Sequence, residues 1–142
     1  MIHETIESWH KFIKGEYPNA LQDLVHDDCV FYSPIVFSPQ KGKDLTIMYL
    51  TAASVAFPGD KANAKTGAAD PSRKFRYTKE VIAGNHAVLE FETTMGGKYV
   101  NGVDMITVDD KGKIVEFRVM IRPLQAVNMV HEQMMKALDS LK

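Results

Sequence analysis

Hydrophobic positions follow a helical period in the first half of the chain and a strand period in most of the second. Between residues 2 and 13 they recur every three or four positions, which predicts an amphipathic helix that ends at Gly15. A second, short helix is predicted after Pro18, since proline is favoured in a first helical turn. Residues 45–57 are apolar on nearly every side, which is typical of a helix sandwiched between layers.

Between these helices we expect a turn at Asp27-Asp28 and a short strand over residues 29–32. The segment 60–72 is small and polar, with glycine and proline residues. Its position beside the third helix makes it a candidate lid, and the alternative is a surface insertion with no role.

From residue 75 the pattern predicts four strands, over 75–83, 86–94, 98–108 and 113–122. The connections are short and rich in glycine, so the strands should form an antiparallel meander. After Pro123 a last helix is predicted, with an apolar seam of Leu124, Val127, His131, Met134, Leu138 and Leu141. Helices early and strands late favour an α+β fold, and the length favours one domain over residues 1–142.

One strand face combines apolar residues with a carboxyl group. In the strand 98–108, alternation places Asp104 on the face of Val100, Gly102, Ile106 and Val108. A carboxyl on an apolar wall should be hydrogen-bonded or have a raised pKa, which is typical of functional sites. The alternative is that Asp104 ties down a loop or a helix end.

Composition narrows the range of partners and compartments. The 17 basic and 18 acidic residues give a net charge of -1, which favours neither nucleic acid nor an anionic membrane as a partner. No apolar run approaches the roughly 20 residues of a membrane span, and charges interrupt the N-terminal segment, so we expect a cytoplasmic protein. Cys29 is the single cysteine, and the five histidines lack metal-site spacing, so no disulfide, metal or cofactor is predicted.

Three segments, 27–34, 42–44 and 102–117, resemble parts of the SnoaL-like and nuclear transport factor 2-like proteins. This resemblance implies a curved antiparallel sheet wrapped with N-terminal helices into a cone, plus a C-terminal helix. Family members include ketosteroid isomerases, epoxide hydrolases, polyketide cyclases, dehydratases and binding proteins without catalysis. The fold therefore leaves the activity open.

The catalytic patterns of the family are retained only in part. Ser33 occupies the position of the isomerase general base, and Trp9 matches its catalytic tyrosine. Asp104 matches the aspartic acid that stabilises the oxyanion, which in ketosteroid isomerases is a carboxylic acid kept neutral by its apolar surroundings. The arginine of the epoxide-hydrolase pattern is replaced by Gly102.

Our first hypothesis is a protein that binds a small apolar molecule without turnover. The candidate pocket residues are Trp9, Phe31, Tyr49, Leu89, Phe91, Ile106, Phe117 and Ile121, with Asp104 and Ser33 as the polar pair. The second hypothesis is an enzyme of the isomerase, cyclase, dehydratase or hydrolase type. It would act on an apolar carbonyl, epoxide or polyketide-like substrate, with Asp104 as the acid and Ser33 orienting a water.

The third hypothesis is a dimeric protein-interaction module that uses the outer face of the sheet. This face should carry Glu90, Glu92, Glu116, Arg118 and Arg122, which suits a partly polar homodimer interface. His131 in the last helix is either a base that reaches the pocket or an interface histidine with its own partner.

Overall fold

The structure is a computed structural model that describes residues 1–57 and 74–141. The predicted loop over 60–72, with its candidate role as a lid, lies outside the described residues. In chain order the elements are α1 (Ile2–Ile13), α2 (Ala20–Leu24), β1 (Val25–Tyr32), β2 (Gln40–Lys41), α3 (Lys43–Ala56), β3 (Arg76–Ala83), β4 (His86–Met95), β5 (Lys98–Val108), β6 (Ile114–Arg122) and α4 (Leu124–Ser140).

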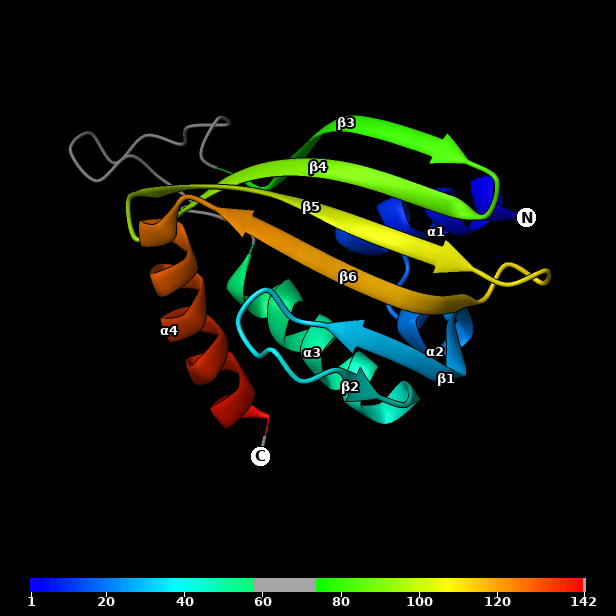
Figure 1. Cartoon of the computed structure of the whole chain (residues 1–142), viewed down its shortest axis with the longest axis horizontal. Helices are drawn as coiled ribbons and strands as arrows, with labels where there is room; N and C mark the ends of the chain where they lie inside the picture. The colour runs from blue at the N-terminus through cyan, green and yellow to red at the C-terminus, as the bar shows by residue number, and fades with distance from the viewer. Residues whose placement is uncertain (58–73, 142) are drawn as a thin grey trace.

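The strands form one curved sheet in the order β2-β1-β6-β5-β4-β3. The predicted meander of β3 to β6 is confirmed, and each strand pairs antiparallel with the next. The exception to antiparallel pairing is β1, which lies parallel to β6. The helices cover one face of the sheet, with α4 across one end (Figure 1). The architecture is therefore the α+β fold that the periodicity predicted.

The inner face of the sheet follows the predicted alternation in β4 and β5. Ala87, Leu89 and Phe91 are buried on β4, and Asp104 and Ile106 are buried opposite them on β5. These residues share the concave face because side chains two positions apart in a strand point the same way.

The last strand departs from the predicted alternation at its start. We expected Val115 on the inner face, but Ile114 is the residue that is fully buried there. A bulge where β5 meets β6, between Thr107 and Val108, shifts the register by one residue. Such an extra residue reverses the faces on one side of the bulge.

The predicted turn at Asp27-Asp28 is wrong. Both aspartates lie inside β1, which begins at Val25 rather than at Cys29. The pairing of β1 with β6 is irregular between Val25 and Val30, and both carboxylates are exposed there. Two turn-forming residues mark an irregularity within a strand here, because an unpaired stretch also tolerates solvated side chains.

The two longest helices are buried on faces that differ from the predictions. On α3, Thr46, Leu50 and Ala52 are buried, but Leu45, Met48 and Val55 are exposed, so the helix is not sandwiched between layers.

The seam predicted for α4 is not the face by which this helix packs, because Leu124 and Leu141 at its two ends are exposed. The residues buried there are Ala126, Val130 and Ala137. Small alanines allow a close approach to the neighbouring elements that a leucine seam would prevent. Among the described helices, none is long and apolar enough to span a membrane.

The buried apolar side chains form two clusters. The first joins α1, β1 and the parts of β4, β5 and β6 nearest to them, and includes Ile6, Leu89, Ile106 and Ile114. The second lies near α4 and includes Phe91, Val100 and Val130. The candidate site lies between the inner face of the sheet and α3, where these clusters meet.

Candidate functional site

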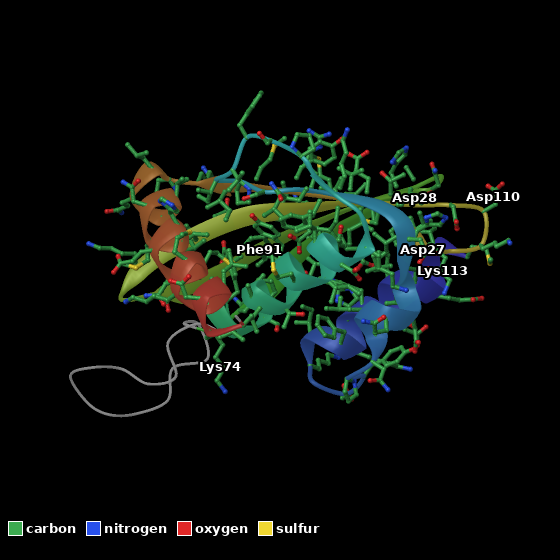
Figure 2. All side chains as sticks on the ribbon, turned by 90° about the horizontal axis from the view of Figure 1, so that it is seen from below. Asp27, Asp28, Lys74, Phe91, Asp110 and Lys113 are labelled. Atoms are coloured by element: carbon green, nitrogen blue, oxygen red, sulfur yellow. The ribbon has the colours of Figure 1, made fainter. Side chains whose placement is uncertain are left out.

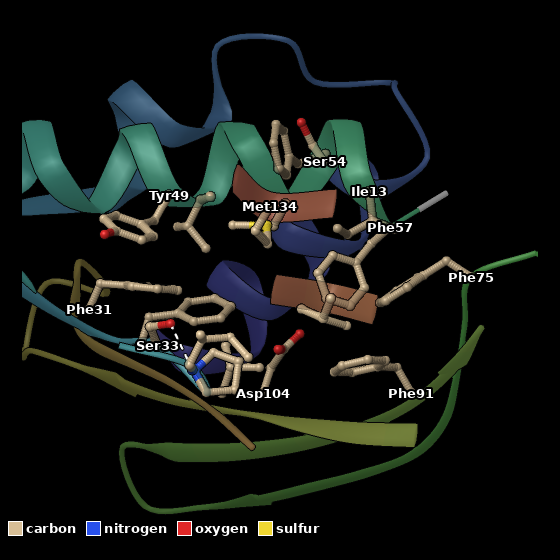
Figure 3. A pocket seen from close by; sticks show the side chains of 18 of the residues that line it. Ile13, Phe31, Ser33, Tyr49, Ser54, Phe57, Phe75, Phe91, Asp104 and Met134 are labelled. Atoms are coloured by element: carbon tan, nitrogen blue, oxygen red, sulfur yellow. Dashed lines mark hydrogen bonds between the residues drawn. The ribbon is translucent and has the colours of Figure 1, made fainter. Parts of the chain in front are cut away.

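A cavity of about 540 Å³ opens between the sheet and α3. Figure 3 shows α3 on one side of this space and the strands on the other, with aromatic side chains between them. Residues of α1 and α4 complete the wall, including Trp9, Phe12, Val130 and Met134. The volume lies within the range of about 300–1,000 Å³ that is typical of small-molecule sites.

Seven of the predicted site residues line this cavity. They are Trp9, Phe31, Ser33, Tyr49, Phe91, Asp104 and Phe117. The other three, Leu89, Ile106 and Ile121, are not among the lining residues. Leu89 and Ile106 are completely enclosed in the first cluster, whereas Ile121 packs against the second. These three residues have the predicted orientation but lie where neighbouring side chains fill the space.

Aromatic rings contact one another along the walls of the cavity. Phe31 stacks on Tyr49 with ring centroids 5.2 Å apart. Farther along, Phe75 stacks on Phe91 at 5.0 Å, and Phe57 meets Phe91 edge to face at 5.8 Å. Rings in such arrangements attract one another beyond their area burial, so they give the cavity firm apolar walls.

The polar centre of the cavity is Asp104, whose carboxyl group points from β5 into the space between the aromatic walls (Figure 3). The hydroxyl group of Tyr77 donates a hydrogen bond to Asp104 Oδ2 at 2.6 Å. The indole Nε1–H of Trp9 in turn donates to the Tyr77 oxygen at 2.8 Å. Among the described residues no hydrogen bond reaches Oδ1, so this oxygen is available to a ligand.

Tyr77 lines the cavity but was not among the residues predicted from the sequence. The spacing of Phe75 and Tyr77 could have indicated it, because aromatic residues two positions apart in a strand share one face. Both side chains line the cavity. A bulge between Tyr77 and Lys79 shifts the register of β3 against β4. Most of the residues of β3 after Tyr77 are exposed. The pattern after Tyr77 therefore gave no consistent inner face.

Burial changes the acidity of both groups in this pair. Loss of solvation raises the pKa of Asp104 to about 7, and the hydrogen bond from Tyr77 opposes this shift in part. Burial and the neighbouring carboxyl group also raise the pKa of Tyr77 well above its usual range. Near neutral pH the site therefore contains a carboxyl group that is partly protonated and able to donate a hydrogen bond, beside a neutral phenol.

Ser33 lines the cavity, but its oxygen already has a local function. Its Oγ accepts hydrogen bonds from the backbone N–H groups of Ile35 and Val36, at 3.0 and 3.1 Å. These bonds hold the turn that follows β1, as serine side chains often do. Ser54, on the opposite wall, donates to the carbonyl of Thr51 in its own helix at 2.7 Å.

The absence of a side chain at Gly102 is explained by Phe91. A Cβ atom at Gly102 would lie 2.5 Å from Phe91 Cζ and 2.6 Å from the backbone oxygen of Met120. The Phe91 ring, which lines the cavity, therefore covers the position where the epoxide-hydrolase pattern has its arginine. The packing of this aromatic wall is incompatible with that pattern.

Within residues 1–57 and 74–141, no group of three His, Cys, Asp or Glu side chains is arranged to hold a metal ion. At its buried centre the described cavity offers a hydrogen bond at Asp104, with apolar contact around it.

The comparisons with known proteins support the fold. No protein-family model and no curated protein matches the chain. Among solved structures, a steroid delta-isomerase from Pseudomonas aeruginosa is 30% identical, with 99% of this chain and 93% of that chain covered and a TM-score of 0.84. A protein with a cystatin-like fold from Silicibacter pomeroyi is 24% identical, with 95% and 85% covered and a TM-score of 0.77.

An NTF2-like protein of unknown function from Mesorhizobium loti is 21% identical, with 86% of this chain and 93% of that chain covered and a TM-score of 0.64. The Pseudomonas protein is 30% identical over nearly the whole of both chains, and this identity shows a family relationship as well as a shared fold. The chain therefore belongs to the SnoaL-like and nuclear transport factor 2-like superfamily that its sequence motifs indicated.

Proposed function

We propose that this protein binds a small, mostly apolar molecule through one hydrogen-bond-accepting oxygen. The observation that carries this proposal is the Asp104 carboxyl group, buried in an aromatic cavity with Oδ1 facing no described protein partner. A protonated carboxyl group there donates to a carbonyl or oxyanion of the ligand. The surrounding rings would cover the rest of the molecule and exclude water.

A matched pair of ligands tests this proposal. 2-Acetylnaphthalene and 2-ethylnaphthalene have nearly the same shape, but only the ketone accepts a hydrogen bond. We expect wild-type protein to bind the ketone about tenfold more tightly at pH 6, measured by quenching of the intrinsic tryptophan fluorescence. Asp104→Leu should remove this preference and leave binding of the ethyl compound unchanged.

The control variant is Asp110→Asn, which alters an exposed carboxylate in the turn between β5 and β6, far from the cavity (Figure 2). It should keep the preference for the ketone. Equal binding of the two compounds to the wild type, or a preference that survives Asp104→Leu, would count against Asp104 as the donor.

An isomerase activity is the second candidate, because the Pseudomonas structure described as a steroid delta-isomerase covers almost the whole chain. Asp104 would then stabilise a developing oxyanion. The position of the general base is Ser33, whose oxygen is engaged by two backbone N–H groups. We therefore expect no turnover of an unsaturated ketosteroid above background, although the steroid itself should bind. Turnover that is lost in Asp104→Asn would establish the enzymatic alternative.

We also propose that the outer face of the sheet forms a homodimer interface. Neighbouring strands place Val81 beside Val88, and Val103 beside Met120, in two adjoining rows. Val81, Val88 and Met120 are large apolar side chains that are exposed on this face.

Glu90 lies beside Val103 in the second row, and polar pairs flank both rows. Arg76 contacts Glu92 at 2.5 Å, and Arg118 contacts Glu116 at 3.2 Å. An apolar centre with a polar rim is typical of protein interfaces. Met120→Arg should convert a dimer into a monomer in sedimentation velocity, and a wild-type monomer would rule this interface out.

A further inference from the structure

Two basic side chains, Lys74 and His131, line the cavity, and their exposure places them at its rim, which we call the entrance. Lys74 immediately precedes β3, and His131 lies on α4; both are exposed. Figure 2 places Lys74 at the end of the molecule where α4 lies, and in Figure 1 the start of β3 also lies at that end. Two separate elements therefore bring basic groups to the same cavity.

Neither basic side chain has a hydrogen bond or an ion pair within the described residues. Their neighbours differ in this respect, because Lys136 on α4 contacts Glu132 at 3.6 Å. The imidazole of His131 therefore has no polar partner among the described residues of its own chain. Within residues 1–57 and 74–141, the ionisable groups that line the cavity, apart from tyrosines, are these two bases and Asp104.

We infer that the ligand is an amphipathic acid, with an anionic group that binds Lys74 and His131 at the entrance. This inference rests on the proposed function, since it concerns the same cavity and adds a second contact to the one at Asp104. A Lys ammonium group and an imidazole N–H both donate to anionic oxygens. The apolar walls between the entrance and Asp104 cannot solvate a charge, so the anion must remain at the rim, where water and these two bases reach it.

The inference implies a ligand with two polar ends. Its neutral oxygen accepts a hydrogen bond from Asp104, its ring system or chain contacts the aromatic walls, and its carboxylate or similar anion stays at the entrance. A neutral molecule of the same size would make the first two contacts only.

A fluorescent acid and its methyl ester separate these cases. 1-Pyrenebutanoic acid is an anion at neutral pH, and the ester has the same ring and chain without the charge. We expect the acid to bind about five- to tenfold more tightly than the ester at roughly 0.05 M NaCl, measured by pyrene fluorescence. At roughly 0.5 M NaCl this difference should shrink, because salt screens exposed charges, while ester binding should stay the same.

The double variant Lys74→Gln with His131→Gln should bind the acid no more tightly than the ester. Both positions are exposed, so the fold should tolerate the changes, and unchanged ester binding confirms that the cavity is intact. Lys136→Gln removes a charge from the same helix outside the cavity, and should leave the preference for the acid intact.

Three other results have distinct meanings. If the ester binds and the acid binds no more tightly, the anionic contact is absent and the inference is wrong, although the proposed function stands. If the preference for the acid survives the double variant but is lost in Asp104→Asn, the anion binds at Asp104 and the inference is again wrong. If neither pyrene compound binds but 2-acetylnaphthalene does, the inference is wrong and the proposed function stands; if 2-acetylnaphthalene also fails to bind, both are wrong.

Discussion

The inner faces of β4 and β5 contain two regions that differ in packing although they share one alternation pattern. Toward one end, Leu89 and Ile106 are enclosed on all sides by apolar neighbours. Toward the other, Phe91 and Asp104 face a cavity. The boundary runs through a single row of the sheet, where Leu89 pairs with Asp104. Orientation toward the core is therefore a property of the strand, whereas packed or open surroundings depend on the helices opposite it.

The largest expected effect concerns the carboxyl group at this boundary. The pKa of Asp104 in the folded protein is about 7, above its ordinary value of 3.8. Asp104 therefore contributes stability below about pH 4, and this contribution is lost as the pH rises through 7. The shift corresponds to roughly 4 kcal/mol.

Relative to the wild type, Asp104→Asn should thus gain up to about 4 kcal/mol in free energy of unfolding between about pH 4 and pH 8. Urea unfolding of both proteins across this range measures the difference. If the difference in free energy of unfolding between the two proteins does not change with pH, the carboxyl group is solvated in the folded protein.

Two identical leucine truncations test the contrast directly. Leu89 is fully buried in the packed region, and Leu50 is nearly as buried but lines the cavity. Leu89→Ala should cost about 3–4 kcal/mol, because it creates a new void. Leu50→Ala should cost about 2 kcal/mol, because it enlarges a space that already exists. Equal losses in urea unfolding would mean that the two regions do not differ in packing.

Gly102 tests how firmly the cavity wall is held. In Gly102→Ala the new methyl group would meet Phe91 and the backbone oxygen of Met120. We expect a loss of about 2 kcal/mol, together with weaker binding of naphthalene compounds as the Phe91 ring is displaced. A smaller loss with unchanged binding would show that Phe91 moves aside freely.

The smallest expected effect concerns Tyr77. Tyr77→Phe keeps the ring but removes the hydroxyl group that donates to Asp104 and accepts from Trp9. Since the Tyr77 hydrogen bond lowers the pKa of Asp104, this pKa should rise further in the variant. The expected loss of stability at pH 5 is about 1 kcal/mol. A carbon-13 NMR titration of the Asp104 carboxyl group would measure the pKa, and a lower value would contradict the assigned hydrogen bond.

Much of the fold could be predicted because its signals are local. Period-two alternation and short glycine turns specify β3 to β6, and they correctly place Asp104 on the inner face. The parallel pairing of β1 with β6 has no local signal, since it joins residues far apart in the chain, such as Phe31 and Phe117. The buried face of α4 was also missed, because alanines such as Ala126 carry little weight in a hydrophobic pattern.

The kinds of residue that line the candidate site could be predicted from the sequence, but not how far the cavity extends along the sheet. Residues such as Phe31 and Phe91 could be chosen because large apolar side chains on inner faces surround any space in such a fold. The same criterion selected Leu89 and Ile106, which lie in the packed region, because alternation does not record where the opposite helices end. Lys74 and His131 were not assigned to an anion, since their shared location depends on tertiary structure.

The hydrogen bonds that run from Trp9 through Tyr77 to Asp104 all point the same way. Their direction leaves the outer carboxyl oxygen as the one group whose role depends on its proton. When it is protonated this oxygen can donate to a ketone or to an alcohol, and when it is ionised it can only accept, which suits an alcohol and excludes a ketone. Since burial raises the pKa of Asp104 to about 7, we expect the affinity for a ketone to fall as the pH rises through this value, while an alcohol with the same carbon skeleton keeps a hydrogen bond at both ends of the range.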